Sequence, residues 1–299
     1  MTSENPLVSV IIPNYNYGKY LIEALNSLLA QDYENWEAII VDNHSTDNTD
    51  DVYAAFSIDS RIRLLKIHNG GSIARSRNEG IREASGQIIA FLDSDDSWKP
   101  SKLRHAVEAH LSGADIVYHD LLRQMDGVVQ KDRGTIRSWH LNKPILRQLL
   151  RDGNALLNSS VSINARLIPM IGLFSESLEL AGAEDYEYWL RCAQGGKSFS
   201  YLPLALGTYR IHGASMSRKD MSGKLSAAVR PYRETLEPRS QRRLDATIAY
   251  TAGRYNYLSG EFNVAQTKLK QVLFFGMLKF KVRAVYMMAA MHFSGKGKS

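Results

Sequence analysis

Three carboxylates stand close together at the end of a predicted strand. Residues 87–92 are mostly apolar and run directly into Asp93, Ser94, Asp95 and Asp96. Carboxylates at this spacing repel one another, and a divalent cation would relieve the repulsion, because Mg²⁺ and Mn²⁺ prefer hard oxygen ligands and can share a diphosphate. The alternative is an acidic turn before the next helix, where negative charge is favourable. The spacing therefore predicts a Mn²⁺ or Mg²⁺ site, with the acidic turn left open.

Polar residues also follow two earlier predicted strands. The first strand ends in residues 13–16, Pro-Asn-Tyr-Asn, and the second in residues 42–47, which include two aspartates. In an open parallel sheet ligands bind beyond the carboxyl ends of the strands, so these residues and the acidic turn should line one site. Neither a glycine-rich dinucleotide fingerprint nor a P-loop sequence is present. Their absence argues against a dinucleotide oxidoreductase and a P-loop phosphotransferase.

The elements that must position these residues alternate along the chain. We expect strands at residues 7–12, 36–41, 62–67, 87–92 and 116–118, and helices at 19–30, 47–56, 72–84 and 101–111. This alternation predicts an α/β fold with a Rossmann-like, mostly parallel sheet and helices on both faces. Further along we expect a hairpin at 121–131, helices at 144–151 and 184–193, and strands at 199–202 and 206–211.

The composition separates the chain into two parts. The 299 residues are 44% hydrophobic, enough for a sizeable core, and a single cysteine, Cys192, excludes an internal disulfide framework. From Met216 onward the pattern is helical, and 16 Lys and Arg stand against 5 Asp and Glu, a net charge of +11, whereas the remainder carries −5. We therefore predict one domain at residues 1–215 and a small, basic, all-helical domain at 216–299.

The basic helical part could contact an anionic partner or present a solvated surface. We expect lipid rather than nucleic acid as that partner, which would give a peripheral membrane contact. The N-terminus lacks a secretory signal, and no apolar run reaches the roughly 18 residues of a membrane span; we therefore expect a cytoplasmic protein, at the inner face of the membrane if the lipid contact exists. Either a tetratricopeptide-like helix pair or a generic helical cap would account for the small and apolar residues Ala249, Gly253, Gly260, Phe262, Ala265, Leu269 and Val272.

Six short sequences, in order, resemble the motifs of family 2 glycosyltransferases of the GT-A fold. They are residues 8–16, 40–47, 77–81, 91–96, 184–191 and 209–212. The resemblance covers about residues 7–215. It implies a GT-A nucleotide-sugar-binding catalytic domain that transfers a sugar, with inversion, from a nucleotide-diphosphate donor, most often a UDP-sugar, to a hydroxyl. We expect a glycan or lipid-linked saccharide of a surface polysaccharide as the acceptor.

The resemblance also implies which residues hold the donor nucleotide. Pro13 and Tyr15 would form a pocket for the base, with the ring of Tyr15 stacked on it, and Asp42 would accept a hydrogen bond from a base imide N–H. The alternative for Asp42 is a turn residue at a strand end. Arg77 matches the family position that binds the diphosphate, and Arg75 could assist it or be an exposed surface charge.

The same resemblance implies a metal site. Asp95 would be the direct ligand of Mn²⁺ or Mg²⁺, and Asp93 would contact the ribose or reach the metal through water. His212 resembles a family histidine that reaches the metal or the diphosphate; the alternative is a hydrogen-bonded loop histidine. Ser94 and Glu184 are further candidates for substrate binding.

Asp185 matches the family's general base. In an inverting reaction one carboxylate must take the proton of the attacking acceptor hydroxyl as the new bond forms. The alternative is a carboxylate that merely caps the helix predicted at 184–193. Trp189 lies four residues on, on the same helix face, and could form an apolar wall for the acceptor.

Two departures from the family pattern bear on the function. Residues 42–45 read Asp-Asn-His-Ser where Asp-Asp-Gly-Ser is common, which leaves the identity of the base open. The Gln-x-x-Arg-Trp motif of processive synthases is absent, since Asp152 follows Arg151; this favours the addition of one or a few sugars. Two other functions stay open: a non-catalytic nucleotide-sugar-binding scaffold and a nucleotidyltransferase.

Overall fold

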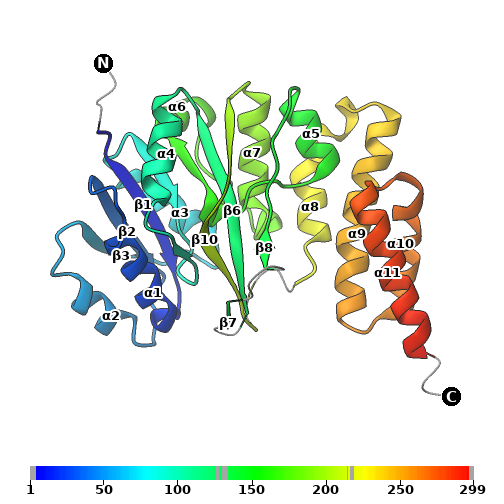
Figure 1. Ribbon diagram of the computed structural model, residues 1–299, viewed down its shortest axis with the longest axis horizontal. Coiled ribbons are helices and arrows are strands. Elements are labelled where there is room, and N and C mark those ends of the chain that lie inside the picture. Colours follow the sequence, from blue (N-terminus) through cyan, green and yellow to red (C-terminus); the bar gives the residue numbers. More distant parts are fainter. Residues whose placement is uncertain (1–4, 126–127, 130–133, 214, 216–218, 296–299) are drawn as a thin grey trace. The chain divides into compact units, whose positions relative to one another are not determined.

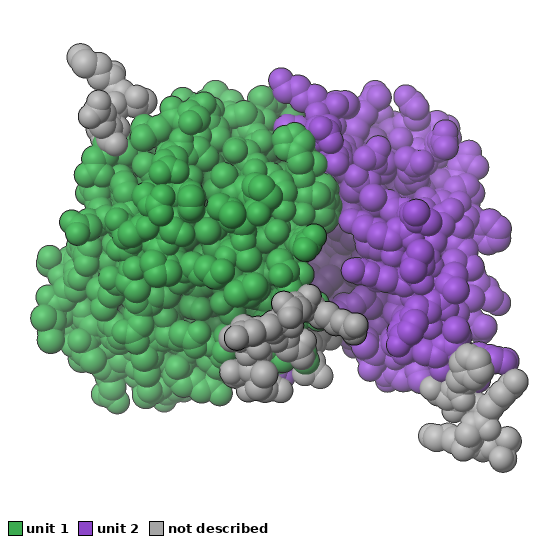
Figure 2. Space-filling view, in the orientation of Figure 1, with its two compact units in different colours: residues 1–141, 155–212 green, residues 142–154, 213–299 purple. Residues whose placement is uncertain are grey.

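The computed structural model describes residues 5–125, 128–129, 134–213, 215 and 219–295. The chain divides into two compact units, coloured separately in Figure 2: residues 1–141 with 155–212, and residues 142–154 with 213–299. The predicted site residues run from Pro13 to His212, and none lies between 142 and 154. All of them therefore belong to the first unit.

The first unit is built on one mixed β-sheet (Figure 1). Its strands are β1 (Val8–Asn14), β2 (Trp36–Asp42), β3 (Ile62–Lys66), β4 (Ile88–Phe91), β5 (Ser97–Trp98), β6 (Ile116–Met125), β7 (Val128–Val129), β8 (Thr135–Ile136), β9 (Ser162–Asn164) and β10 (Phe199–Ile211). In the described part of the chain their order is β3-β2-β1-β4-β9-β6-β10-β5, and β7 and β8 pair with β6. Strands β1 to β4 run parallel, so the carboxyl ends of β1, β2 and β4 meet at one edge of the sheet.

Helices cover both faces of this sheet. They are α1 (Gly18–Leu29), α2 (Thr49–Phe56), α3 (Ile73–Arg82), α4 (Lys102–Leu111), α6 (Leu167–Ile171) and α7 (Glu184–Gln194), with the 3-10 turns η1 (Asn158–Ser160) and η2 (Leu178–Leu180). Successive side chains of a strand point to opposite faces. Val10 and Ile12 of β1 accordingly pack with Leu21 and Leu25 of α1, whereas Ile11 between them faces α3.

The helix α3 lies very close to the sheet at Gly80. A Cβ atom built on Gly80 would lie 2.5 Å from Cγ2 of Ile11 and 3.1 Å from Cγ2 of Val41, so only glycine allows this approach. Arg77 stands three residues earlier, on the same side of the helix, and is buried. The close packing of α3 therefore fixes the depth at which the Arg77 side chain lies.

The predicted α/β architecture, with helices on both faces of the sheet and a helical C-terminal part, is confirmed. The strands predicted at 199–202 and 206–211 form one strand, β10, whose register with β6 shifts twice between Leu202 and Thr208. Pro203 lies in this interval and cannot donate a ladder hydrogen bond, which explains why the sequence pattern breaks there.

Three other features differ from the sequence prediction or fall outside the described residues. Strand β9 was not predicted, because three residues are too few to show an alternating pattern; it lies antiparallel between β4 and β6. The strand predicted at 116–118 continues to Met125. The turn at Asp126 and Gly127 of the predicted hairpin lies outside the described residues, although β7 does pair antiparallel with β6.

The elements described in the second unit are all helices. Its elements are α5 (Ile145–Asp152), α8 (Ser222–Val229), the 3-10 helix η4 (Arg230–Thr235), α9 (Pro238–Leu258), α10 (Phe262–Phe275) and α11 (Leu278–Gly295). Helices α9 and α10 approach closely at Gly253, where an added Cβ would lie 2.8 Å from the Leu269 side chain. Ala265, Leu269 and Ala284 are fully buried in the core of this unit. Among the described residues, no helix has both the length and the apolar character needed to cross a bilayer.

The segment 142–154 packs with the C-terminal helices, which the sequence did not indicate. Thr247 of α9 donates its hydroxyl to the carbonyl of Arg151 at 3.2 Å, across 96 residues of sequence. The helix itself was predicted at 144–151, but its packing partner could not be, since nothing local marks a contact at that separation. The division into domains at 1–215 and 216–299 stays a prediction.

Candidate active site

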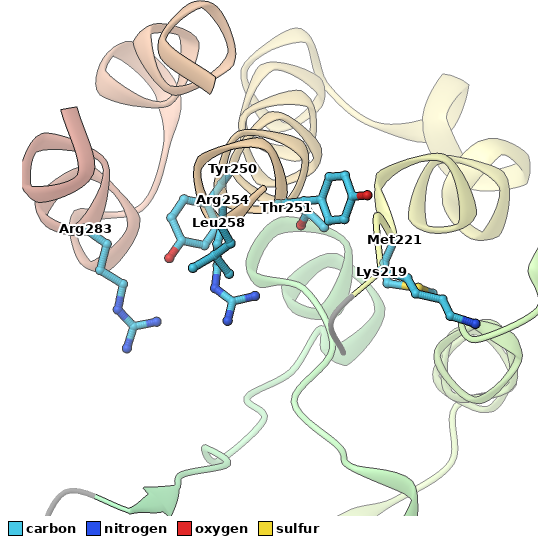
Figure 3. Close-up of a pocket in the computed structure, with 8 residues that line it drawn as sticks. Lys219, Met221, Tyr250, Thr251, Arg254, Leu258 and Arg283 are labelled. Atoms are coloured by element: carbon cyan, nitrogen blue, oxygen red, sulfur yellow. The ribbon is translucent and has the colours of Figure 1, made fainter. Parts of the chain in front are cut away.

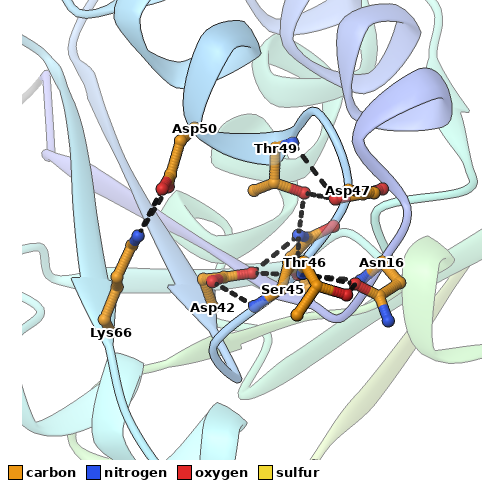
Figure 4. A network of polar contacts seen from close by, with 9 residues as sticks. Asn16, Asp42, Ser45, Thr46, Asp47, Thr49, Asp50 and Lys66 are labelled. Carbon is orange, nitrogen blue, oxygen red and sulfur yellow. Dashed lines mark hydrogen bonds and ion pairs between the residues drawn. The ribbon is translucent and has the colours of Figure 1, made fainter.

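The loop after β2 is held by a hydrogen-bond network around Asp42 (Figure 4). Asp42 is fully buried. Its Oδ1 accepts from Asn14 Nδ2 at 2.9 Å and from Ser45 Oγ at 2.5 Å, and its Oδ2 accepts from the Ser45 N–H at 2.9 Å. Asp42 thus ties the end of β1 to the loop after β2, and its contact with a base stays a prediction.

The end of β1 leaves Tyr15 open to a ligand. The next residue, Asn16, has a left-handed backbone with φ of 54°, and its N–H donates to Ser45 Oγ at 2.8 Å. Asn tolerates this conformation better than most residues. Pro13 is buried within β1, whereas Tyr15 is 56% exposed. Of the two residues predicted to hold the base, Tyr15 therefore presents the open ring surface.

The acidic turn after β4 buries Asp96 and leaves Asp93 and Asp95 partly exposed. Asp96 Oδ1 accepts from the Arg210 N–H at 2.9 Å, and Asp95 Oδ2 lies 2.9 Å from His212 Nε2. Ser94, between Asp93 and Asp95, is buried. Burial, and next the neighbouring carboxylates, raise the pKa of Asp95 and that of Asp96 above the usual range. His212 opposes this shift at Asp95 only in part, and a bound cation would oppose it further.

Two tyrosines flank His212: Tyr20 of α1, and Tyr17, the N-cap residue of this helix. The imidazole stacks on Tyr20 with the ring centroids 5.0 Å apart, and it meets the edge of Tyr17 at 5.2 Å. Burial and the nearby carboxylate of Asp95 raise the pKa of the Tyr17 hydroxyl, so that this group stays protonated beside the acidic turn. Nothing in the sequence pattern identified these tyrosines, although both follow the first polar strand end within a few residues.

The predicted metal ligands suit a divalent cation that also binds a diphosphate. In the part of the chain that the structure describes, no group of three or more His, Cys, Asp or Glu side chains is arranged to hold a metal ion. Asp95 and His212 are in contact, whereas Asp93 Oδ1 is engaged by Arg77 at 2.9 Å. Mg²⁺ is commonly held by one or two carboxylates together with phosphate oxygens of a substrate, and imidazole is an accepted ligand of softer divalent ions. The donor set of Asp95 and His212 fits this arrangement.

Arg77 joins the acidic turn to the start of α7. Its Nη1 lies 2.6 Å from Glu184 Oε1 and its Nη2 lies 2.9 Å from Asp93 Oδ1, and the side chain is 3% exposed. Burial alone would lower the pKa of Arg77, but Asp93 and Glu184 raise it, so the guanidinium stays charged. Asn158, which the sequence pattern did not identify, accepts from Arg77 Nε at 3.1 Å when its amide oxygen faces the guanidinium. The contact of Arg77 with a diphosphate stays a prediction.

Arg75 differs from Arg77 in its surroundings. It is exposed, and its side chain has no hydrogen-bond or ion-pair partner among the described residues. Its backbone N–H lies 3.4 Å from Ser72 Oγ, the N-cap of α3. The guanidinium of Arg75 is therefore available to an anionic ligand at the start of this helix.

Asp185 lies in the first turn of α7, next to Glu184. The N-cap of this helix is Ala183, so Asp185 is not the capping residue, although its Oδ1 accepts from the Tyr186 N–H at 2.6 Å. Burial, and next the carboxylate of Glu184, raise the pKa of Asp185 to about 7, against the opposing effect of Arg77. A carboxyl group with this pKa can exchange a proton near neutral pH.

The expectation that Trp189 forms an acceptor wall is wrong. Trp189 is fully buried, with its ring 6.1 Å from that of Phe174 and 6.5 Å from that of Phe91. The spacing of four residues does place Trp189 and Asp185 on one side of α7, but that side turns into the core one helical turn after Asp185. Helical spacing shows that two residues share a helix face, but it does not show which of them the protein core buries.

The family model for glycosyl transferase family 2 matches residues 9–163, just over half of the 299 residues. A putative teichuronic acid biosynthesis glycosyltransferase, TuaG, of Bacillus subtilis (strain 168) is 43% identical over 109 residues, which are 36% of this chain and 43% of that protein. The glucosyltransferase WfgD of Escherichia coli, named as transferring from UDP-Glc to alpha-D-GlcNAc-diphosphoundecaprenol, is 43% identical over 105 residues, 35% of this chain and 41% of that protein. The chain spans less than half the length of each of these two relatives.

Two solved structures share the fold. That of residues 1–349 of TarS from S. aureus, in complex with UDP-GlcNAc, has a TM-score of 0.64 at 21% identity and covers 95% of this chain and 88% of that one. That of the mannosyltransferase PcManGT from Pyrobaculum calidifontis, in complex with GDP-Man and Mn²⁺, has a TM-score of 0.62 at 18% identity and covers 96% of this chain and 81% of that one. The family model covers more than half of the chain, and the ordered motifs and the observed sheet agree with it, so the chain belongs to glycosyl transferase family 2.

Proposed function

We propose that the protein is an inverting, metal-dependent glycosyltransferase. It moves a sugar from a nucleotide-diphosphate donor, with a UDP-sugar favoured, to a hydroxyl of a glycan or lipid-linked acceptor in polysaccharide assembly. The observation that carries this proposal is the buried Arg77, which binds Asp93 at one side and Glu184 at the other. It brings a carboxyl group with a pKa of about 7, that of Asp185, close to the acidic turn. The names of TuaG and WfgD, and the UDP-GlcNAc bound to TarS, support the same reaction class.

The residues of this chain would divide the reaction between them. Tyr15 would stack on the base, and Arg75 would contact the diphosphate from the start of α3. A divalent cation bound by Asp95 and His212 would neutralise negative charge on the departing diphosphate. The acceptor hydroxyl forms a bond to the anomeric carbon, the bond from that carbon to the diphosphate oxygen breaks, and Asp185 takes the hydroxyl proton. Arg77 is a positioning residue here, because it holds Asp93 and Glu184.

A donor screen tests this proposal. The full chain would be incubated with UDP-, GDP- and dTDP-sugars, Mn²⁺ or Mg²⁺ and a lipid-linked saccharide acceptor, and both nucleoside diphosphate and pyrophosphate would be measured. We expect nucleoside diphosphate, fastest from a UDP-sugar. Release of pyrophosphate would instead indicate a nucleotidyltransferase, and tight donor binding without any release would indicate a binding scaffold.

An apolar stripe on α11 supports a further proposal, that the helical unit contacts a membrane. Leu278, Val282, Val285 and Tyr286 are between 55% and 77% exposed, and their spacing places them on one side of the helix. The opposite side packs into the core of the unit, where Ala284 is fully buried. An exposed apolar surface of this kind marks an interaction site.

Basic residues flank this stripe and favour anionic lipid as its partner. Lys281 and Arg283 precede and follow Val282, so that at 3.6 residues per turn they stand on either side of the stripe. Apolar residues bordered by cations are typical of helices that lie in the headgroup region of a membrane. The contact would hold the protein at the surface on which a lipid-linked acceptor is presented.

Replacing both Val282 and Val285 with Ser should weaken this contact. We expect binding to vesicles of phosphatidylcholine and phosphatidylglycerol, measured by flotation, to fall about tenfold, because two apolar side chains leave the lipid. Ile58→Ser is the control, since Ile58 is an exposed apolar residue of the first unit. Unchanged vesicle binding would rule out the membrane contact, and a change of oligomeric state would assign the stripe to a second copy of the chain.

A further inference from the structure

A basic cavity lies within the helical unit. Its volume is about 330 Å³, and it is drawn in Figure 3. It is lined by residues of α9, of α11 and of the segment before α8, namely Lys219, Met221, Tyr250, Thr251, Arg254, Tyr255, Leu258 and Arg283. Three of these are cations and none is an acid. All of them belong to the same compact unit.

The cations of this cavity are not neutralised. Arg254, Arg283 and Lys219 are exposed, and none has a carboxylate partner among the described residues. The side chains of Arg254 and Arg283 extend to the same side of their helices, whereas that of Lys219 stands at the other wall and extends away from them (Figure 3).

The remaining walls combine hydroxyl groups with apolar surface. Tyr250 is held rigid by stacking on Phe280, with the ring centroids 4.4 Å apart. Tyr255 and Thr251 add hydroxyls, and Leu258 adds an apolar wall. A cavity of this volume is at the lower end of the range for small-molecule sites. The cavity can hold one anionic group attached to a small molecule. It is too small to bind several nucleotides of a nucleic-acid strand.

We propose that this cavity is an accessory site for a phosphate group carried on a saccharide or on a polyisoprenyl lipid. Arg254 and Arg283 would bind the phosphate oxygens, since guanidinium matches phosphate geometry with paired hydrogen bonds. Tyr255 would donate to the same group or to a sugar hydroxyl. The site lies wholly in the helical unit and is independent of the transfer reaction proposed above.

Protection of arginine from phenylglyoxal tests this site directly. The full chain would be labelled without nucleotide sugar, and modification at each arginine would be measured by mass spectrometry. We expect glucose 1-phosphate to slow labelling of Arg254 and Arg283 by roughly tenfold at saturation, as hydrogen bonds to charged groups imply, and glucose to have no effect. Arg239 is the internal control, because it is an exposed arginine of α9 outside the cavity.

A second set of samples, with lipid vesicles, distinguishes a phosphate group carried on a lipid from one carried on a soluble saccharide. Phosphatidylcholine vesicles with a polyisoprenyl diphosphate would be compared with plain phosphatidylcholine vesicles. Protection by the vesicles with polyisoprenyl diphosphate, but not by plain vesicles or by glucose 1-phosphate, would identify a lipid-linked ligand. Protection by glucose 1-phosphate would identify a soluble one; either result supports the site. Equal labelling of Arg254 and Arg283 in all samples would overturn it, whatever the outcome of the donor screen.

Paired variants give a second measurement. Arg254→Gln with Arg283→Gln should weaken the binding of the protecting ligand by about tenfold or more. The control pair, Arg239→Gln with Lys268→Gln, removes the same number of charges from exposed positions of α9 and α10 outside the cavity. The affinity for the protecting ligand should stay unchanged in this pair. Equal weakening in both pairs would assign the effect to net charge and would contradict a defined site.

Discussion

Replacing Asp185 with Asn is expected to lower the rate of sugar transfer by about 10²–10⁴-fold while the affinity for the nucleotide-sugar donor stays near that of the wild type. The amide cannot take a proton from the acceptor hydroxyl, but it has the same shape as the carboxyl group. Arg77 keeps its contacts with Asp93 and Glu184 in this variant, so the donor side of the site should be unaffected. Donor affinity is measured by calorimetry and transfer by nucleoside diphosphate release.

The pH dependence of the wild type should report the same group. The pKa of Asp185 is about 7, so kcat/KM should fall tenfold for each pH unit below that value and level off above it. A base must be deprotonated to act, which fixes this direction. The residual activity of Asp185→Asn should lack the step near pH 7.

As the pH rises, the contribution of Asp185 to the stability of the fold should fall while the activity rises. The carboxyl group of Asp185 has a folded pKa of about 7, above its usual value of 3.8, so it contributes stability that is present below pH 3.8 and is lost as the pH rises to about 7. Asp185→Asn removes this loss. We expect the variant to be more stable than the wild type by roughly 1–3 kcal/mol at pH 8 and about equally stable at pH 4, measured by urea unfolding.

Glu187→Gln is the matched control for Asp185→Asn. Glu187 lies in the same first turn of α7 but pairs with Arg191 at 2.7 Å, away from Arg77. Its replacement should leave transfer and its pH profile unchanged. Wild-type turnover in Asp185→Asn would remove Asp185 as the base, and a loss of transfer that goes with lower stability would assign it a structural role.

The sequence predicted the frame of the site well because local patterns determine it. Short runs of mostly apolar residues mark β1, β2 and β4, and each of these strands leads into polar residues that a parallel sheet must bring to one edge. The pairing of Arg77 had no such signal. Its partners Asp93 and Glu184 are 16 and 107 residues away. They become its neighbours only because the turn after β4 and the start of α7 both fold against Arg77 of α3.

The burial of individual side chains could also not be predicted from the sequence. Asp42 and Tyr15 both stand at strand ends, yet the first is fully buried and bonded to Ser45, whereas the second is open. The position of a residue at a strand end predicts that it lies at the edge of the sheet. Whether the following loop buries that residue depends on the path of the loop, which the sequence pattern does not show. The same holds for Trp189, which helix spacing placed correctly and core packing covered.

Replacing Asp95 with Ala is the second large change that the site predicts. The variant loses the carboxylate that contacts His212, and with it one of the two side chains suited to a divalent cation. Transfer should fall by about 10³-fold, since a metal ion supplies several kcal/mol of stabilisation to the developing charge. After EDTA treatment, addition of Mn²⁺ or Mg²⁺ should restore the transfer activity of the wild type but not that of the variant.

Loss of activity in Asp95→Ala should not arise from unfolding, because of the charges around it. Neighbouring carboxylates contribute to the raised pKa of Asp95 and of Asp96, so removing one of them relieves repulsion and should leave the metal-free protein at least as stable. Mn²⁺ with UDP should raise the melting temperature of the wild type and leave that of the variant unchanged, since a ligand stabilises only a state that binds it. Asp51→Ala, at an exposed position of α2, controls for the lost charge and should behave as the wild type in both assays. Full metal-dependent activity in Asp95→Ala would place the cation elsewhere and would separate the acidic turn from the chemistry.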